Sequence, residues 1–289
     1  MKKFIILLLV ATVVVAAGFA DPIGLKVYID GFGFGNVAGD TYKFAGTGGE
    51  GNITPGIEYN RALGPIAFNT SLQDGFTFSD PLAQDLRWHV KGTYALQVAE
   101  ASKLSFFLYN RLHLKGANEE FANTDYDLIT DNFGPGIRFD QTLDFGGLYA
   151  EGGVDFNIHT QDGKKLEVGT SDTDHIRLGV TTKFGLYGSV QIVLKFLNDA
   201  GETPSDGAFR NIRPRIGYVY GPIDGRVTFD IPTKDKGIEG TGITIEPRVT
   251  YNNIIPGLAA YANFAITGVG AKDPVKIGFK PTIGVSYAF

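Results

Sequence analysis

Hydrophobic and polar residues alternate along most of this chain. The clearest example is the segment 86–98, where the even positions are apolar or small and the odd positions are mostly polar. A helix with 3.6 residues per turn would mix these two sets, whereas an extended strand places them on opposite faces. The segment is also longer than a typical globular strand of about five or six residues. We therefore predict a long β-strand with one apolar and one polar face.

The same alternation recurs along the chain and predicts fourteen antiparallel strands, with twelve or sixteen as the alternatives. The predicted strands span residues 24–34, 51–62, 65–73, 85–98, 103–116, 132–143, 147–159, 175–185, 187–198, 210–220, 223–232, 242–252, 257–266 and 275–289. We expect their ends to be accurate to about two to four residues. The fold class is therefore all-β.

The connections between these strands alternate between short and long. The short turns are centred on 62–65, 99–102, 144–146, 185, 221–222 and 253–256. The long polar segments are 35–50, 74–84, 117–131, 160–174, 199–209, 233–241 and 267–274. Strict alternation places every short turn at one end of the sheet, which is the asymmetry of outer-membrane barrels. We therefore predict a transmembrane antiparallel up-and-down β-barrel; the alternative is a soluble sandwich or barrel whose apolar faces form a closed core.

The first twenty residues have the features of a secretory signal. Lys2 and Lys3 are basic, residues 4–17 are apolar, and Gly18 and Ala20 supply the small residues of a cleavage site before Asp21. The apolar run is shorter than the about 20 residues that a spanning helix needs. We expect a cleaved signal peptide over 1–20 and a single barrel domain over 21–289.

Composition excludes several other classes of protein. The chain has no Cys, so disulfides, thiolate zinc sites and cysteine nucleophiles are ruled out. The segment after residue 20 has 24 Lys and Arg against 31 Asp and Glu, a net charge of −7. A chain of this charge lacks the basic balance of a nucleic-acid-binding protein. No cofactor is indicated.

The predicted last strand is apolar at every odd position and ends on an aromatic residue. This pattern resembles the terminal strand of bacterial outer-membrane β-barrel proteins. In that family the alternating residues and the final aromatic are recognised by the barrel assembly machinery, and the matching residues here are Val285, Tyr287 and Phe289. Within the family, the chain is most similar to monomeric porins of about fourteen strands. The resemblance implies a bacterial outer-membrane location, a lipid bilayer around the barrel and a monomeric state.

Aromatic residues on the apolar faces agree with a lipid-facing band. Such rings form girdles at the membrane interfaces of barrels. The residues of this set are Trp88, Tyr94, Phe139, Phe156, Phe196, Tyr218, Phe229, Tyr251, Phe264 and Tyr287.

If the apolar face meets lipid, the polar face lines a lumen. The fourth and fifth strands carry six basic residues that the turn at 99–102 would bring into one ladder. These residues are Arg87, His89, Lys91, Arg111, His113 and Lys115. The tenth strand adds Arg213 and Arg215, whereas Asp230 and Glu246 lie on strands eleven and twelve, across a ring of fourteen from the ladder.

A basic wall facing acidic residues resembles the constriction of a general porin. Rings of fixed charge and pore width select the ions that pass. We therefore predict an outer-membrane porin-like channel for passive diffusion of ions and small polar solutes, without catalysis and with a mild anion preference. The alternative for each lumen charge is that it pairs with a neighbour and keeps the wall wet.

Signals for other chemistry are weak. Residues 46–51 match the nucleotide-binding pattern G-x-G-x-x-G, but no helix is predicted to follow them. His159 and His175 flank one loop and could approach each other, yet two imidazoles make a poor metal site. Glu151 and Lys183 are expected to pair across the lumen wall.

Two other functions remain as alternatives. The first is an adhesin or structural barrel, although the predicted loops are short for that role. The second is a barrel hydrolase with a loop-side active site, which His159 and Asp155 could imitate. That possibility is less favoured because no second acidic pair accompanies them.

Overall fold

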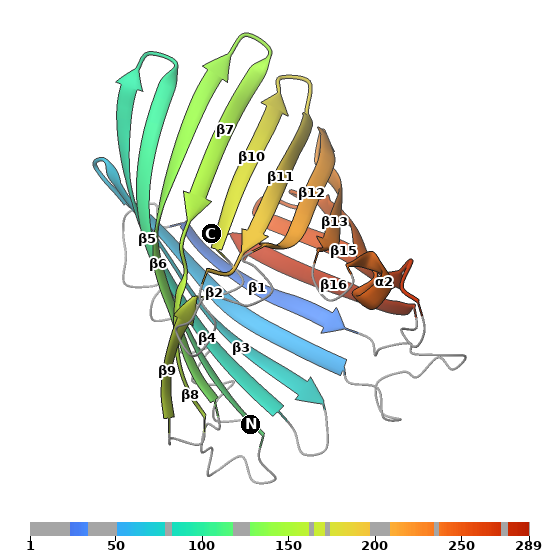
Figure 1. Cartoon of the computed structure of the whole chain (residues 1–289). Coiled ribbons are helices and arrows are strands. Elements are labelled where there is room, and N and C mark those ends of the chain that lie inside the picture. The colour runs from blue at the N-terminus through green and yellow to red at the C-terminus, as the bar shows by residue number, and fades with distance from the viewer. Residues whose placement is uncertain are drawn as a thin grey trace.

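The computed structural model describes residues 24–33, 51–78, 83–117, 128–161, 165–170, 174–196, 209–233, 237–272 and 277–288. These residues form antiparallel β-strands and one short helix (Figure 1). The elements are β1 (Gly24–Gly33), β2 (Gly51–Leu63), β3 (Ile66–Phe78), β4 (Ala83–Ala99), β5 (Ser102–Ala117), β6 (Leu128–Leu143), β7 (Gly146–Gly153), β8 (Phe156–Gln161), β9 (Lys165–Thr170), β10 (Asp174–Thr182), β11 (Leu186–Leu194), β12 (Phe209–Tyr220), β13 (Ile223–Pro232), α2 (Ile238–Thr241), β14 (Ile243–Tyr251), β15 (Leu258–Val269) and β16 (Gly278–Ala288). No helix in these ranges is long and apolar enough to cross a bilayer.

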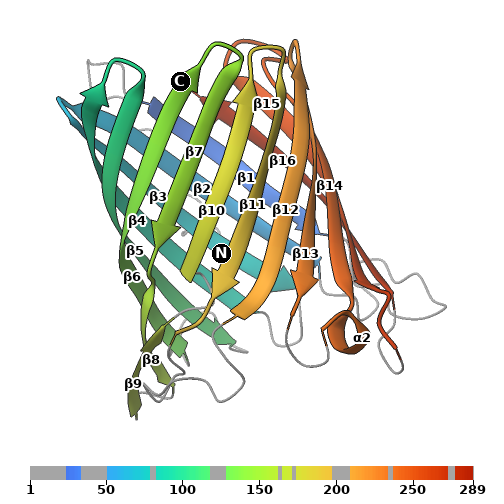
Figure 2. The same cartoon turned by 45° about the horizontal axis from the view of Figure 1, so that its top comes forward.

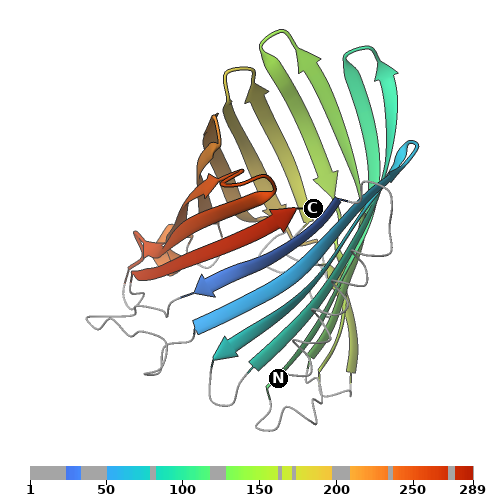
Figure 3. The same ribbon diagram turned by 180° about the vertical axis from the view of Figure 1, so that it is seen from behind.

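The backbone pairings connect these strands into a ring. Apart from β7 with β8 and β9 with β10, strands that follow each other along the chain pair side by side. β16 pairs in turn with β1, where Tyr287 lies opposite Val27. Figure 3 shows this junction, with the blue β1 beside the red β16. The pairing of β5 with β6 completes the ring on the other side. The predicted up-and-down barrel is confirmed.

The ring contains fourteen strands because two of them are each interrupted once. β7 and β8 run in the same direction and both pair with β6, so together they form the predicted strand 147–159, broken at Val154 and Asp155. β9 pairs with β8 and β10 with β7, so β9 and β10 are the two parts of the next strand. The expectation of a loop over all of 160–174 is therefore wrong. Only Leu166 and Val168 are large and apolar in β9, too few for a clear alternation signal.

The short turns lie together at one end of the barrel. Figure 2 shows these hairpins at the top, whereas β8, β9 and α2 lie at the opposite end. Two of the turns are Gly-Pro pairs, at Gly64 and Gly221, and the φ angles of the two glycines are +61° and +56°. Glycine reaches this left-handed region without a steric penalty, which is why it starts two-residue hairpin loops.

The two faces of the ring differ in the way that the alternation predicts. On β10 the outward Ile176 and Leu178 are 49% and 59% exposed, whereas the inward His175 and Arg177 are half-buried. Among the residues whose side chains are described, the buried apolar ones are Phe107, Val193 and Ala265, all on the inner face. A soluble sandwich would bury its large apolar side chains, so that alternative is wrong.

Most of the predicted lipid-facing aromatics are exposed on the outer face. Phe156 and Phe229 are partly covered. The exposed ones are Trp88, Tyr94, Phe139, Phe196, Tyr218, Tyr251, Phe264 and Tyr287.

Aromatic rings on the inner face repeatedly lie over glycines of the next strand. Tyr261 of β15 lies directly opposite Gly284 of β16, and a Cβ on Gly284 would overlap its ring. The same arrangement occurs for Tyr149 with Gly179, Tyr187 with Gly217 and Phe107 with Gly136. A ring over a strand glycine covers backbone that would otherwise be bare, which pins the register of the pair.

We expect Gly284→Ala to lower the free energy of unfolding by about 1 kcal/mol, because the added methyl displaces the Tyr261 ring. Gly225→Ala is the matched control, since nothing lies within 4 Å of its Cβ position. Denaturant unfolding in detergent micelles measures both. Equal stability of the two variants would show that the ring and glycine do not interlock.

Candidate functional site

A cavity of about 410 Å³ lies inside the ring and is bounded by side chains from seven strands. Its lining residues are Asn69, His89, Val90, Lys91, Phe107, Tyr109, Arg111, Glu151, His175, Arg177, Gln191 and Arg213. Asn69 belongs to β3 and Arg213 to β12, which are seven positions apart in the ring of fourteen strands. The lining strands therefore cover half of the ring, and side chains from its two opposite ends bound one space.

The pairing of β4 with β5 brings the basic residues of the two strands side by side. Arg87 lies opposite His113, His89 opposite Arg111, and the backbone of Lys115 opposite that of Asp85. The two-residue turn at 100–101 holds the strands at this register. The ladder is closely packed, because the Nε2 atoms of His89 and His113 are 3.4 Å apart.

Two cations of the ladder lie over aromatic rings of β5. The ammonium of Lys91 is 4.1 Å from the centroid of the Phe107 ring, and the guanidinium of Arg111 is 5.0 Å from that of Tyr109. Such contacts hold a cation by the negative face of the ring. They position Lys91 and Arg111 along the cavity wall.

Arg111 also binds Asp155, in the break between β7 and β8. The Asp155 side chain is fully buried, and the hydroxyl of Tyr109 donates a hydrogen bond of 3.4 Å to the neighbouring carbonyl of Val154. A buried carboxylate is stable only when it is paired, so Arg111 and Asp155 form a structural pair. Asp155 therefore does not serve as the acidic residue of the loop-side hydrolase site that was the alternative from sequence.

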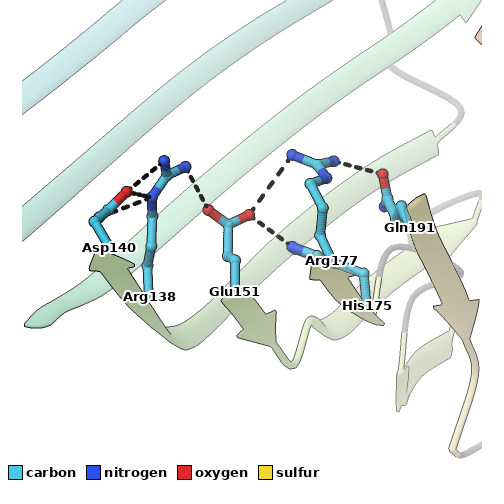
Figure 4. Close-up of polar contacts among 6 residues, drawn as sticks. All are labelled: Arg138, Asp140, Glu151, His175, Arg177 and Gln191. Atoms are coloured by element: carbon cyan, nitrogen blue, oxygen red, sulfur yellow. Dashed lines mark hydrogen bonds and ion pairs between the residues drawn. The ribbon is translucent and has the colours of Figure 1, made fainter. Parts of the chain in front are cut away.

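Glu151 is the centre of an ion-pair network on the wall beside the ladder, which begins at β6, the pairing partner of β5 (Figure 4). Its Oε1 lies 3.0 Å from Nε2 of His175 and 3.6 Å from Nη1 of Arg177, and its Oε2 lies 3.5 Å from Nη1 of Arg138. Arg138 in turn binds Asp140 at 2.7 Å, and Arg177 donates to Gln191. The network joins four neighbouring strands, β6, β7, β10 and β11.

The expected pair of Glu151 with Lys183 is wrong. Glu151 lies opposite Arg177 in the pairing of β7 with β10, and Lys183 lies in the turn after β10. The two strands are joined by a long connection, so no short turn reveals their register from sequence. Glu151 and His175 were predicted on the lumen side but not among the constriction residues. Arg177 and Gln191 were not predicted as pore residues, although both have the inward parity that could have identified them.

Arg213, Arg215, Asp230 and Glu246 all lie on the inner face, as their parity predicts. Asp230 of β13 is seven positions from β4 in the ring, but its carboxylate is bound by its neighbour Arg213, whose Nε is 2.9 Å away. Arg215 donates to the hydroxyl of Thr228 at 3.2 Å, and Glu246 is exposed. The acidic residue that lines the cavity is Glu151 rather than Asp230 or Glu246.

His159 and His175, the two histidines considered as metal ligands, lie on different strands, β8 and β10. The backbone of His159 is opposite Thr130 and Glu167, whereas that of His175 is opposite Gly153 and Val193. In the described ranges, no three His, Asp or Glu side chains are grouped to hold a metal ion.

The C-terminal signature lies on β16. Val285 and Tyr287 are exposed on the outer face, in line with their apolar parity. Phe289 and the predicted signal peptide over 1–20 fall outside the described residues.

The fold is similar to that of solved outer-membrane proteins at very low sequence identity. The TodX deltaS2S3 mutant, a monoaromatic hydrocarbon channel, matches with a TM-score of 0.55 and 9% identity, over 94% of this chain and 91% of that one. CdiB from Acinetobacter baumannii matches with a TM-score of 0.50 and 9% identity, over 93% of this chain and 60% of that one. Outer membrane phospholipase A from Escherichia coli matches with a TM-score of 0.44 and 12% identity, over 71% and 80%. No family model matches the sequence, and no curated protein matches it. The similarities to the TodX variant and to CdiB establish the outer-membrane β-barrel fold and not the activity.

We expect Glu151→Gln to lower the free energy of unfolding by about 1–3 kcal/mol, because Arg138, His175 and Arg177 lose the carboxylate that they share. Glu246→Gln, at the exposed carboxylate of β14, should change stability by less than about 0.5 kcal/mol. Urea unfolding of the two variants in the same detergent makes the comparison. A Glu151 variant as stable as the Glu246 variant would contradict a structural role for the network.

Proposed function

We propose that the protein is an outer-membrane channel for passive diffusion of ions and small polar solutes. The supporting observation is the cavity, where charged side chains from opposite walls bound one space inside a ring of strands. Charged side chains that line a pore select permeating solutes by their field and by pore width. No step of this mechanism needs a catalytic group or a cofactor.

The charges of the cavity favour anions. Lys91, Arg111, Arg177 and Arg213 line it, together with a single carboxylate, that of Glu151. Two neighbouring carboxylates compensate part of this positive charge, because Asp155 binds Arg111 and Asp230 binds Arg213. The preference for anions is therefore mild.

The lining also bears on which solutes could cross. The structurally similar TodX variant is a hydrocarbon channel. A hydrocarbon gains nothing from guanidinium and carboxylate groups, which would have to lose water as it passed. The lumen of this protein therefore suits polar solutes.

Location and assembly form part of the proposal. A bilayer would surround the apolar outer face, and the barrel assembly machinery would recognise Val285, Tyr287 and Phe289 after export through a cleaved signal. The barrel would act as a monomer, because one chain completes the ring.

Single-channel recording in planar bilayers tests the function. We expect stepwise conductance with a chloride-to-potassium permeability ratio above unity, and we expect Lys91→Glu to lower this ratio more than Lys103→Glu. The reason is that Lys91 lines the cavity, whereas Lys103 is an exposed residue near the short turns. Absence of conductance, or strong cation selectivity, would exclude the proposed channel, and absence would favour an adhesin or structural barrel.

Assembly is tested separately at the C-terminus. Phe289→Ala should reduce the amount of folded barrel in the outer membrane, because the terminal aromatic would no longer be recognised. Phe264→Ala, at an exposed outer aromatic of β15, is the matched control. Membrane fractionation and electrophoretic mobility of the folded form measure both, and equal yields would contradict recognition of the terminus.

A further inference from the structure

We propose that the lumen cavity is a binding site for a small organic dianion whose two negative groups lie at opposite ends of the molecule. The inference rests on the proposed function, because the solute reaches the site through the lumen. The argument starts from the distribution of cations around the cavity, which are divided between two walls.

The first wall is formed by β4 and β5 and presents Lys91 and Arg111. Lys91 is held against the Phe107 ring, and Arg111 is held by the buried Asp155. These contacts hold the two cations in place, and both cations line the cavity. A preorganised cation binds an anion without a further ordering cost.

The second wall is formed by β10 and β12 and presents Arg177 and Arg213. Arg213 donates its Nε to Asp230, a bond that does not use the four hydrogens on its Nη atoms. Arg177 is held by Glu151 and Gln191. Glu151 is itself shared with His175 and Arg138, so its negative charge is spread over several cations and does not cancel Arg177 alone.

The outermost cations of the two walls are far apart along the ring, although Arg111 and Arg177 are separated only by β6 and β7. Lys91 and Arg213 lie six positions apart in a ring of fourteen strands, close to diametrically opposite. A compact anion would therefore not contact Lys91 and Arg213 together, whereas a molecule charged at both ends can contact both. Guanidinium groups match carboxylate and phosphate oxygens in geometry, so either group can form an end.

The space between the walls limits the size of the ligand. Its volume of about 410 Å³ corresponds to roughly a dozen water molecules. The amides of Asn69 and Gln191 and the aromatic rings of Phe107 and Tyr109 also line it. These groups suit a short carbon chain with polar substituents between the two charged ends.

Block of the chloride current by added anions tests the site. The probes are succinate, with a charge at each end, acetate, with one charge, and inorganic phosphate, with its charge in one place. We expect succinate to block the chloride current with an apparent dissociation constant about tenfold or more below that of acetate. The reason is that contacts to a second wall add about 1.4 kcal/mol. Phosphate should resemble acetate.

Substitutions then locate the effect. Lys91→Gln and Arg213→Gln, one from each wall, should each remove the advantage of succinate over acetate. Arg226→Gln removes an inward charge of β13 outside the cavity and should keep the advantage. Circular dichroism of each variant confirms that the barrel has folded.

Three results would overturn the proposal: equal block by succinate and acetate, block by phosphate as strong as by succinate, or an equal loss in the Arg226 variant. A channel that conducts chloride but does not discriminate these anions would leave the proposed function intact. If no current is seen, the proposed function fails, and calorimetric titration of the detergent-solubilised protein with succinate still decides whether the site exists.

Discussion

The hydrogen bonding of the backbone is the constraint on which the rest of this structure depends. A segment inside hydrocarbon has no water to satisfy its N–H and C=O groups, so strands can span a membrane only as a ring without edges. The pairing of β16 with β1 and of β5 with β6 provides that ring. Because successive side chains of a strand alternate in direction, the same ring sorts the sequence into an apolar outer face and a polar inner face. The mean hydropathy of zero is the average of these two faces.

The inner face has its own constraint, because its polar groups need partners where side chains approach closely. Glu151 binds Arg138, His175 and Arg177 from two neighbouring strands, and Asp155 is buried only because Arg111 binds it. These pairs support the register of neighbouring strands and also hold the cations of the cavity in place. Structure and proposed selectivity therefore depend on the same residues.

The elements that local pattern determines could be predicted from the sequence. The alternation of 86–98 identified β4 and its faces, and the short turn after it placed Arg87 opposite His113. The partner of Glu151 could not be predicted in this way, because the long connection between β7 and β10 leaves their register open. Nor could the sequence show that Asp230 binds its neighbour Arg213, since parity gives the face of a residue but not the reach of its side chain. The cavity could not be predicted either, because it depends on which side chains from distant strands approach each other.

The central claim is that the odd-numbered residues of β4 face a conducting lumen and that the even-numbered residues face lipid. The chain has no native cysteine, so single cysteines can be introduced along β4 without interference. The most direct measurement is the effect of a charged, membrane-impermeant thiol reagent on the current through these variants in planar bilayers. We predict stepwise loss of current for cysteines at positions 87, 89 and 91 and no change at positions 88, 90 and 92. Equal effects at even and odd positions, or block confined to the even ones, would contradict the account.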